Sequence, residues 1–380
     1  MKYRKFGSLD WHASVLGFGA MRLPLVGKDV SRVDEPEAIK MIRHAVDQGV
    51  NYVDTAYPYH EKNGEIVVGK ALLNGYRQKV KLATKLPSWL IEKPDDFDRF
   101  LGEQLDKLQT DHIDFYLLHA LNSTYWPKLR DWKVLNWAES AIADGRIHYL
   151  GFSFHDEFEV FKNIVDAYDN WAFCQIQYNF VDIEYQAGTR GLQYAADKGL
   201  AVVIMEPLRG GQLTHKVPPS VSELWESTTV QRTPADWALQ WIWNHAEVSM
   251  VLSGMTTMQQ VFENLHSADC SGAGMLSEEE LAIVEKVREE YRRLTPVPCT
   301  HCRYCMPCPN GVEIVDILNY YSDAIIYDNP GAPRFLYRNL PADKQADNCV
   351  ECFECEEKCP QGISIAEYLK KAHAWLGEKK

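Results

Sequence analysis

Ten cysteines occur in the 380-residue chain, and eight of them fall into two short runs near the carboxyl terminus. The first run, CTHCRYCMPCP, begins at Cys299, and the second, CVECFECEEKCP, begins at Cys349. In a reducing compartment, clustered cysteines more often hold metal than form disulfides. The carboxyl-terminal part of the chain is therefore predicted to bind metal through its thiolates.

The spacing of the second run, C-x2-C-x2-C-x3-C-P, matches the run that holds a [4Fe–4S] cluster in bacterial ferredoxins. The first run is one residue shorter before its last cysteine. In two-cluster domains of this kind the fourth cysteine of each run ligates the other cluster. We expect cluster one to bind Cys299, Cys302, Cys305 and Cys359, and cluster two to bind Cys349, Cys352, Cys355 and Cys308. Two structural zinc sites are the alternative, although zinc requires neither a third cysteine at this spacing nor the following proline.

A second set of reactive side chains lies in the first third of the chain. Asp54, Lys85 and His119 each stand at the end of an apolar run, and Tyr59 follows Asp54 by five positions. Taken singly, they have ordinary explanations as a helix cap, a solvated charge and a structural histidine. If the runs are parallel strands of a barrel, their carboxyl ends meet at one face and bring the side chains together. Such a group could carry out proton chemistry.

Tyr59 is the candidate proton donor of this group. A phenol titrates near pH 10, and burial raises that value further. Lowering it by three units requires about 4 kcal/mol, which one ammonium at about 4 Å supplies at an effective dielectric near 20. Lys85 is the candidate ammonium, with Asp54 holding it in place and His119 orienting the substrate oxygen. The reaction that suits these groups is reduction of a carbonyl by hydride, with Tyr59 donating the proton.

The elements that must position these side chains alternate between short apolar runs and longer segments with helical periodicity. Strand-like runs occur at residues 15–21, 51–56, 80–86, 113–119, 147–153, 173–179, 200–208 and 249–254. Helical periodicity marks residues 36–49, 95–108, 133–145 and 234–245, among others. Eight such repeats predict an α/β fold of the (β/α)8 TIM-barrel class. A doubly wound open sheet is the alternative, but no G-x-G-x-x-G fingerprint follows the first strand.

The two ends of this barrel sequence carry further signals. Residues 3–15 alternate around a Gly-Ser turn and predict a hairpin that closes the barrel floor. Two prolines at residues 296 and 298 precede the first cysteine run, which places a domain boundary there. We expect a barrel over residues 1–295 and a small ferredoxin-like domain with two [4Fe–4S] clusters over residues 296–380. Residues 309–321 and 360–375 predict matched helices, one after each cysteine run.

The barrel sequence resembles the aldo/keto reductases in the segments LGFGAM, DTAYPY, LATKL, YLLH, GFS, CQIQYN, MEPL and VFENL. The resemblance implies a catalytic tetrad of Asp54, Tyr59, Lys85 and His119 and a nicotinamide cofactor in the barrel mouth. It also implies that Ser153 and Gln175 hold the carboxamide of the nicotinamide, and that further cofactor-binding positions are Gly19, Met21, Asp54, Met205, Leu208, Gly254, Gln260 and Asn264. The tail resembles the iron–sulfur branch of this family, in which a ferredoxin-like domain follows the barrel.

Three departures from the family pattern concern the cofactor. Phe154 follows Ser153 where the family usually has a Ser-Asn pair, and Met205 stands where a tyrosine commonly stacks on the nicotinamide. Gly254 and Gln260 align with the lysine and arginine that hold the 2′-phosphate of NADP in many members. A bidentate arginine is the natural phosphate clamp, so its absence leaves NAD and NADP both open.

Composition excludes some classes of protein and partner. With 46% hydrophobic and 24% charged residues the chain is expected to be globular, and its net charge of −13 argues against a nucleic-acid partner. No apolar run approaches the roughly 20 residues that cross a bilayer, and the amino terminus lacks a signal-peptide pattern. We therefore expect a cytoplasmic protein without a membrane partner.

The expected function is that of an NAD(P)H-dependent oxidoreductase acting on a small aldehyde or ketone, or on the corresponding alcohol in reverse. A ferredoxin or another redox protein is a possible partner of the clusters, which either relay electrons or only hold the tail together. The alternative is an iron–sulfur electron-transfer or docking module in which the barrel is not the main catalyst. Aromatic residues in loops could wall a substrate pocket; these are Trp89, Tyr125, Trp126 and Trp225.

Overall fold

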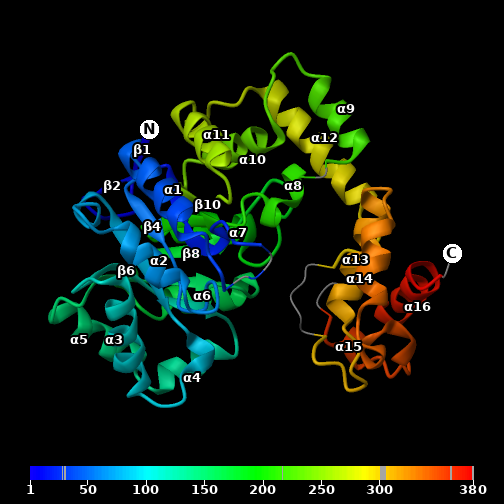
Figure 1. Cartoon of the computed structure of the whole chain (residues 1–380), viewed down its shortest axis with the longest axis horizontal. Helices are drawn as coiled ribbons and strands as arrows, with labels where there is room; N and C mark the ends of the chain where they lie inside the picture. Colours follow the sequence, from blue (N-terminus) through cyan, green and yellow to red (C-terminus); the bar gives the residue numbers. More distant parts are fainter. Residues whose placement is uncertain (28, 30, 216, 300–304, 360–361, 379–380) are drawn as a thin grey trace. The chain divides into compact units, whose positions relative to one another are not determined.

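The structure is a computed structural model that describes residues 1–27, 29, 31–215, 217–299, 305–359 and 362–378 (Figure 1). The chain forms two compact units. One comprises Met1–Gly211 and Arg232–Ser277, and the other comprises Gln212–Gln231 and Glu278–Lys380. The second unit thus includes residues 212–231 and 278–295 in addition to the segment predicted as a ferredoxin-like domain. The functional boundary at residue 295 stays a prediction.

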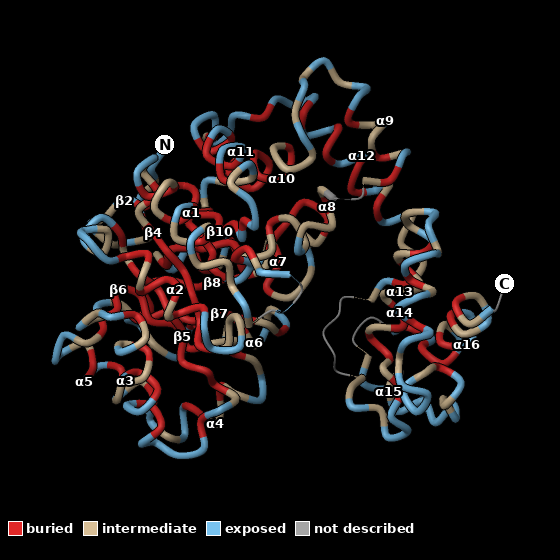
Figure 2. Tube along the Cα trace, viewed as in Figure 1, coloured by how far each residue is buried: buried red, intermediate tan, exposed pale blue. Residues whose placement is uncertain are grey.

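Eight parallel strands of the first unit close into a barrel, in which β10 pairs with both β3 and β9. The strands are β3 (Leu16–Gly19), β4 (Tyr52–Asp54), β5 (Lys81–Leu86), β6 (Ile113–Leu121), β7 (Ile147–Phe154), β8 (Phe173–Gln177), β9 (Ala201–Met205) and β10 (Val248–Gly254). Each falls within, or within two residues of, one of the eight predicted runs. The strands are almost entirely buried, as expected for a parallel sheet covered on both faces (Figure 2). The (β/α)8 fold is therefore confirmed.

Helices follow the barrel strands along the chain. In the first unit they are α1 (Glu35–Asp47), α2 (Gly64–Ala71), α3 (Asp96–Leu108), α4 (Tyr125–Asp131), α5 (Val134–Ala143), α6 (Phe158–Asp166), α7 (Gly188–Asp197), α10 (Pro234–Trp243) and α11 (Met258–Asp269). Several begin at side-chain caps that the sequence supplies: Asp34 accepts from the amide of Glu37 at 3.2 Å, and Thr233 accepts from the amide of Asp236 at 3.1 Å.

The floor of the barrel is closed by a hairpin, as predicted. Strands β1 (Tyr3–Lys5) and β2 (His12–Ser14) pair antiparallel. Between them, the buried ring of Phe6 packs 4.9 Å from Phe115 and 5.8 Å from Phe173, which lie near the amino ends of β6 and β8. Because aromatic side chains fill this end, the opposite end, where the strands terminate, is left to hold a site.

The second unit is helical. It contains α8 (Gln212–His215), α9 (Pro219–Glu226), α12 (Glu278–Leu294), α13 (Ile314–Ile326), α14 (Gly331–Arg338), α15 (Glu354–Glu357) and α16 (Ile365–Leu376). Helices α13 and α16, which were predicted after the two cysteine runs, contribute Ile317, Leu318 and Leu369 to one apolar core. Among the residues that the structure describes, no helix is both long and apolar enough to cross a bilayer.

Candidate active site and thiolate site

An ion pair between Asp54 and Lys85 lies at the carboxyl ends of two neighbouring strands. Asp54 ends β4 and Lys85 is the next-to-last residue of β5, and the two strands pair in parallel. Lys85 Nζ lies 2.6 Å from Asp54 Oδ1 and donates to the carbonyl oxygen of Thr55 at 2.8 Å. Both side chains are buried, so water does not weaken the attraction, and the ammonium is held in one position.

Tyr59 and His119 complete the group that was predicted to be catalytic. The ammonium of Lys85 lies 5.3 Å from the centroid of the Tyr59 ring. The Tyr59 and His119 ring centroids are 6.4 Å apart, and His119 Nδ1 has no hydrogen-bond partner among the described residues. The structure thus brings Asp54, Tyr59, Lys85 and His119 together at the barrel mouth. Their catalytic roles stay a prediction.

The acidity expected of Tyr59 is not found. Burial raises the pKa of the Tyr59 phenol above its usual 10.0, Lys85 lowers it by less, and Asp54 adds to the rise. The ammonium of Lys85 acting alone would lower the pKa of the phenol. In the structure the carboxylate of Asp54 offsets that charge at 2.6 Å, and the phenol is also withdrawn from water. Tyr59 is therefore a neutral phenol at physiological pH.

The pKa values of Lys85 and His119, which lie beside Tyr59, are shifted as well. Burial would lower the pKa of Lys85, but Asp54 and Tyr59 together raise it above its usual value. Burial and the charge of Lys85 hold the pKa of His119 well below 6.5. Lys85 therefore keeps its proton, and His119 stays an uncharged imidazole that can still hydrogen-bond a polar ligand.

A buried polar network behind the mouth fixes the strand that carries Lys85. Gln104 of α3 donates to the carbonyl oxygen of Lys85 at 3.0 Å and to Glu65 Oε1 at 2.7 Å. Thr84, the neighbour of Lys85, also donates to Glu65 Oε1 at 2.7 Å. These bonds tie α2 and α3 to β5, so the position of Lys85 depends on side chains that do not reach the mouth themselves.

Ser153 and Gln175, the predicted carboxamide contacts, lie on the adjacent strands β7 and β8. Both are buried, and they pair in register across these strands. Ser153 Oγ accepts from the amide of Ala120 at 2.8 Å, which leaves its own proton to donate to a ligand. Gln175 Oε1 is buried without a partner in the described part of the chain. Buried acceptors are nearly always satisfied, so this oxygen fits a cofactor amide.

The remaining predicted cofactor positions lie around the same end of the barrel. Gly19 ends β3 and Met205 ends β9, while Met21 and Leu208 lie two and three residues beyond these strand ends. Asn264 of α11 is buried and donates to Ser253 Oγ at 2.9 Å. These contacts position the residues at the mouth, and their role in binding a cofactor stays a prediction.

Gln260, by contrast, is engaged in capping a helix. Its Oε1 accepts from the amides of Thr256 and Thr257 at 2.7 and 3.3 Å, and Thr257 caps α11 in return. A side chain used in this capping box is not a free replacement for a phosphate-binding arginine. The T-x-x-Q pattern before α11 was visible in the sequence and could have indicated this role.

A pair of opposite charges at the mouth, Arg22 and Glu206, was not among the residues predicted for the site. Arg22 lies 3.3 Å from Glu206, and the two follow β3 and β9, the strands on either side of β10. The Arg22 side chain crosses Gly254, where an added Cβ would lie 3.2 Å from its Cγ. Glu206 also contributes to the raised pKa of Tyr59. The pair is separated by 184 positions, and only its place after two strand ends could have indicated it.

Of the four aromatic residues predicted as possible pocket walls, Trp89 contacts the predicted group. Its ring lies 5.0 Å from that of His119. Trp126 is buried and packs against Trp171, and Trp225 is buried in α9 of the second unit. These two belong to hydrophobic packing. Tyr125 opens α4 and has the ammonium of Lys128 over its ring at 5.9 Å.

The second cysteine run forms a pocket with the last cysteine of the first run. It is lined by Cys308, Cys349, Cys352 and Cys355, together with Pro309, Asn310, Ile314, Val350, Phe353, Ala366 and Leu369. These four thiols are the predicted ligands of cluster two. A set of four thiolates around an otherwise mostly apolar space fits a [4Fe–4S] cluster. Burial, Glu356 and the neighbouring Cys349 and Cys308 raise the pKa of Cys355 to about 11, so a bound metal would have to displace its proton.

The predicted ligands of cluster one are only partly covered by the structure. Cys299, Cys305 and Cys359 pack against the apolar core of the second unit. Cys302 lies outside the described residues. The assignment of these four cysteines to one cluster therefore stays a prediction.

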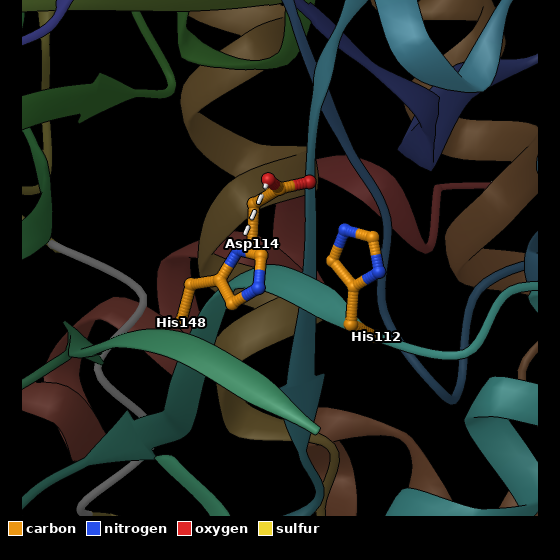
Figure 3. Close-up of side chains that lie close together, drawn as sticks. All are labelled: His112, Asp114 and His148. Atoms are coloured by element: carbon orange, nitrogen blue, oxygen red, sulfur yellow. Dashed lines mark ion pairs between the residues drawn. The ribbon is translucent and has the colours of Figure 1, made fainter. Parts of the chain in front are cut away.

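A third group of possible ligands lies at the opposite end of the barrel (Figure 3). Each of three residues offers one ligand atom, and these atoms all lie within 4.8 Å of one another; the residues are His112, Asp114 and His148. However, Asp114 already accepts from Lys81 and pairs with Arg77, each at 2.8 Å. Two cations at this carboxylate would repel a divalent ion, so we interpret the group as a structural link between β5, β6 and β7.

The fold, the groups at its mouth and the cysteine-rich unit define a barrel oxidoreductase with an attached iron–sulfur domain. Residues 15–289 match the aldo/keto reductase family model, and residues 298–364 match a 4Fe-4S dicluster domain. The chain belongs to the aldo/keto reductase family.

Curated relatives include oxidoreductases of several kinds. An uncharacterized oxidoreductase, YrpG, of Bacillus subtilis is 30% identical over 238 residues, which are 57% of this chain and 69% of the relative. L-galactose dehydrogenase of Arabidopsis thaliana is 25% identical, over 78% of this chain and 97% of its own. NADH-specific methylglyoxal reductase of Escherichia coli is 24% identical, over 77% of this chain and all of its own.

Solved structures show the same barrel. The holo form of an aldo-keto reductase from Bacillus halodurans matches with a TM-score of 0.62 and 27% identity, over 76% of this chain and 96% of its own. An aldo-keto reductase from Klebsiella pneumoniae in complex with NADPH matches with a TM-score of 0.62 and 24% identity, over 76% and 95% of the two chains. The second likeness supports the fold alone.

Proposed function

We propose that the barrel reduces an aldehyde or ketone with NADH or NADPH, or oxidises the corresponding alcohol, and that Tyr59 transfers the proton. The observation that carries this proposal is the buried Asp54–Lys85 ion pair at 2.6 Å, with its ammonium 5.3 Å from the Tyr59 ring. A positively charged group fixed beside a neutral phenol stabilises the anion that forms when the phenol gives up its proton.

Each residue of the mouth has a defined part in this proposal. Tyr59 holds the proton to be donated to the substrate oxygen, and Lys85 stabilises the phenolate that results. Asp54 keeps Lys85 protonated, and the uncharged His119 orients the substrate oxygen by a hydrogen bond. A bound nicotinamide supplies or accepts the hydride. Trp89, packed against His119, forms one side of the substrate space.

The proposed cofactor contacts come from polar and charged side chains at the mouth. Gln175 Oε1 and the Ser153 hydroxyl would hold the carboxamide of the nicotinamide, one accepting and one donating. Arg22, beside Gly254, would offer a positive charge to a phosphate of the dinucleotide once it separates from Glu206. The names of relatives point to both NADH and NADPH, so we propose a nicotinamide dinucleotide without choosing between the two.

The test is turnover by anaerobically purified protein. NADH or NADPH oxidation is followed with a panel of simple aldehydes, ketones and sugars, first for the parent chain and then for Tyr59→Phe. We expect the substitution to lower kcat/KM by about 10²–10⁴-fold, the range for loss of a positioned general acid. Tyr52→Phe, the same change at the first residue of β4, the strand that precedes Tyr59, is the matched control and should keep its activity.

Two results would contradict the proposal. One is a complete absence of turnover across the panel with either dinucleotide. The other is a Tyr59→Phe variant as active as the parent. The first result would favour an iron–sulfur electron-transfer or docking protein in which the barrel is not the main catalyst, and the second would remove Tyr59 as the proton donor.

We further propose that the carboxyl-terminal unit holds two [4Fe–4S] clusters in a reducing compartment such as the cytoplasm. Hydride transfer moves two electrons, whereas each cluster moves one, so the mouth residues alone provide no route between them. Anaerobic reconstitution followed by EPR after NADH or NADPH addition tests cluster type, cluster number and electronic coupling together. A signal that appears on dinucleotide addition would support a relay, and clusters that stay oxidised would support a structural role.

A further inference from the structure

The loop at residues 350–354 helps to line the thiolate pocket of the second cysteine run and is itself exposed. Every residue from 350 to 354 is exposed, including two large apolar residues, Val350 at 65% and Phe353 at 48%. Both line the pocket beside Cys352. Phe353 has a φ of 62°, a backbone conformation that side chains of its size rarely adopt. Such conformations persist mainly where the surrounding structure or a function requires them.

Exposed carboxylates neighbour these apolar side chains in the sequence. Glu351, Glu354 and Glu357 are exposed, and two lysines offset only part of this charge: Lys370 lies 2.7 Å from Glu351 and Lys358 lies 3.7 Å from Glu354. A [4Fe–4S] cluster in the pocket would add to the negative charge, because four thiolates outweigh the charge of the iron–sulfur core. The loop and the residues next to it thus combine exposed apolar side chains with an excess of negative charge.

We propose that the loop at residues 350–354 is the docking surface through which cluster two exchanges electrons with a small basic redox protein. Transient electron-transfer complexes bury little area, and opposite charges steer the partners together. A second copy of this chain fits poorly, because its net charge is also negative at −13. In each exchange cluster two loses one electron and the metal centre of the partner gains it, with no bond made or broken.

This proposal requires cluster two in the thiolate pocket, but it does not require reductase activity in the barrel. Its test therefore uses full-length chain whose clusters have been reduced by dithionite, with the excess removed. Oxidised cytochrome c, a basic one-electron haem protein, is the probe, and the second-order rate of haem reduction is measured by stopped flow. Iron and sulfide content and the EPR spectrum are checked for every variant, so loss of a cluster is recognised.

The variants separate the loop from the rest of the surface. Glu351→Lys/Glu354→Lys is compared with Glu278→Lys/Glu279→Lys, which makes the same change in net charge at exposed positions of α12. We expect the first pair to slow haem reduction roughly tenfold more than the second and to weaken its dependence on salt. Phe353→Ala should slow it several-fold, while Phe353→Leu retains most of the rate. Phe335→Ala, at a residue that is 67% exposed on α14, should have no effect.

Three outcomes would overturn the proposal. Equal slowing by the two charge-reversed pairs would show that only net charge matters. A Phe353→Ala variant with intact clusters and the rate of the parent would show that the exposed apolar side chain makes no contact with the partner. Loop variants that leave haem reduction unchanged but alter cluster reduction by NADH or NADPH would show that the loop serves the chain's own barrel.

Discussion

Each end of the barrel has a buried aspartate that pairs with a lysine, Asp54 with Lys85 at the mouth and Asp114 with Lys81 at the floor, and the two carboxylates differ in how many partners they have. At the mouth, Asp54 pairs with Lys85 through Oδ1, and its Oδ2 has no partner among the described residues. At the floor, Asp114 Oδ1 accepts from Lys81, while its Oδ2 accepts from the amide of Leu82 at 3.0 Å and pairs with Arg77. Within the described part of the chain, the aspartate at the mouth therefore keeps one oxygen available to a ligand, whereas both oxygens of the aspartate at the floor already have partners.

The titration of the two carboxyl groups differs accordingly. Burial raises the pKa of Asp54 despite the nearby Lys85. Burial acts in the same direction on Asp114, but Arg77, the Leu82 amide and Lys81 together lower its pKa below the usual value. Incomplete pairing at the mouth costs stability and leaves room for chemistry, whereas complete pairing at the floor stabilises the fold.

Exchanging each lysine for methionine should give the largest contrast between the two ends. Lys85→Met removes the charge that stabilises the Tyr59 phenolate, and we expect kcat/KM for carbonyl reduction to fall by about 10³-fold, the equivalent of about 4 kcal/mol. Lys81→Met, at a lysine that is 36% exposed, should leave kcat/KM unchanged. Steady-state kinetics of both variants measure this contrast. A similar loss of kcat/KM in both variants would show that the two lysines do not differ in their contribution to catalysis.

Removing the floor carboxylate should affect stability instead of activity. Asp114→Asn leaves Arg77 and Lys81 without their shared anion, and we expect the free energy of unfolding to fall by about 3 kcal/mol, the lower end for breaking a buried pair. Urea unfolding of parent and variant measures this loss, with kcat of the folded variant as the control. An unchanged urea midpoint would mean that the floor pair is not stabilising.

The contribution of Asp114 should also depend on pH. Because its pKa is lower in the folded chain than in the unfolded chain, the unfolded chain binds more protons, and stability rises with pH across this range. The stability difference between the parent and Asp114→Asn should be complete above about pH 4, the usual value for Asp, and shrink as the pH falls further. Urea midpoints at a series of pH values check this. A stability difference that grows as the pH falls would contradict the predicted direction of the pKa shift.

The smallest effect is expected at Tyr52, whose buried hydroxyl lacks a hydrogen-bond partner among the described residues although it belongs to the floor. Tyr52→Phe removes this unsatisfied group and should leave the stability unchanged or raise it by up to about 1 kcal/mol. Thermal unfolding measures the change. A clear loss of stability would indicate a bound water or another partner at this hydroxyl.

Much of the fold and of the mouth could be predicted from the sequence, because both depend on local patterns. Each barrel strand is a short apolar run, and Asp54, Lys85 and His119 stand at or near the ends of such runs, so parallel pairing brings them together. The pKa of Tyr59 could not be predicted in the same way, because it depends on how closely Asp54 offsets Lys85 and on how deeply the phenol is buried.

Other features depend on contacts between distant segments. Arg22 and Glu206 are far apart in the chain, and their pairing follows only from the closure of the barrel through β10. The assignment of Gln212–Gln231 to the second unit likewise has no local signal, because its sequence lies between two barrel strands. The role of Gln260, in contrast, was indicated by its capping-box pattern and was overlooked in favour of an alignment with a phosphate-binding residue.

The path of the chain between the two units has a practical consequence for limited proteolysis. The polypeptide passes from the first unit to the second at residue 211, returns at 231 and leaves again at 277. A single cut at any one of these crossings divides the chain into two fragments, which are then held together only by non-covalent packing between segments of the same unit. Cleavage at residue 277 alone would separate the cysteine-bearing segment 278–380 from the rest of the chain, and this fragment would stay bound through its packing against residues 212–231, where Ser220 Oγ donates to Glu290.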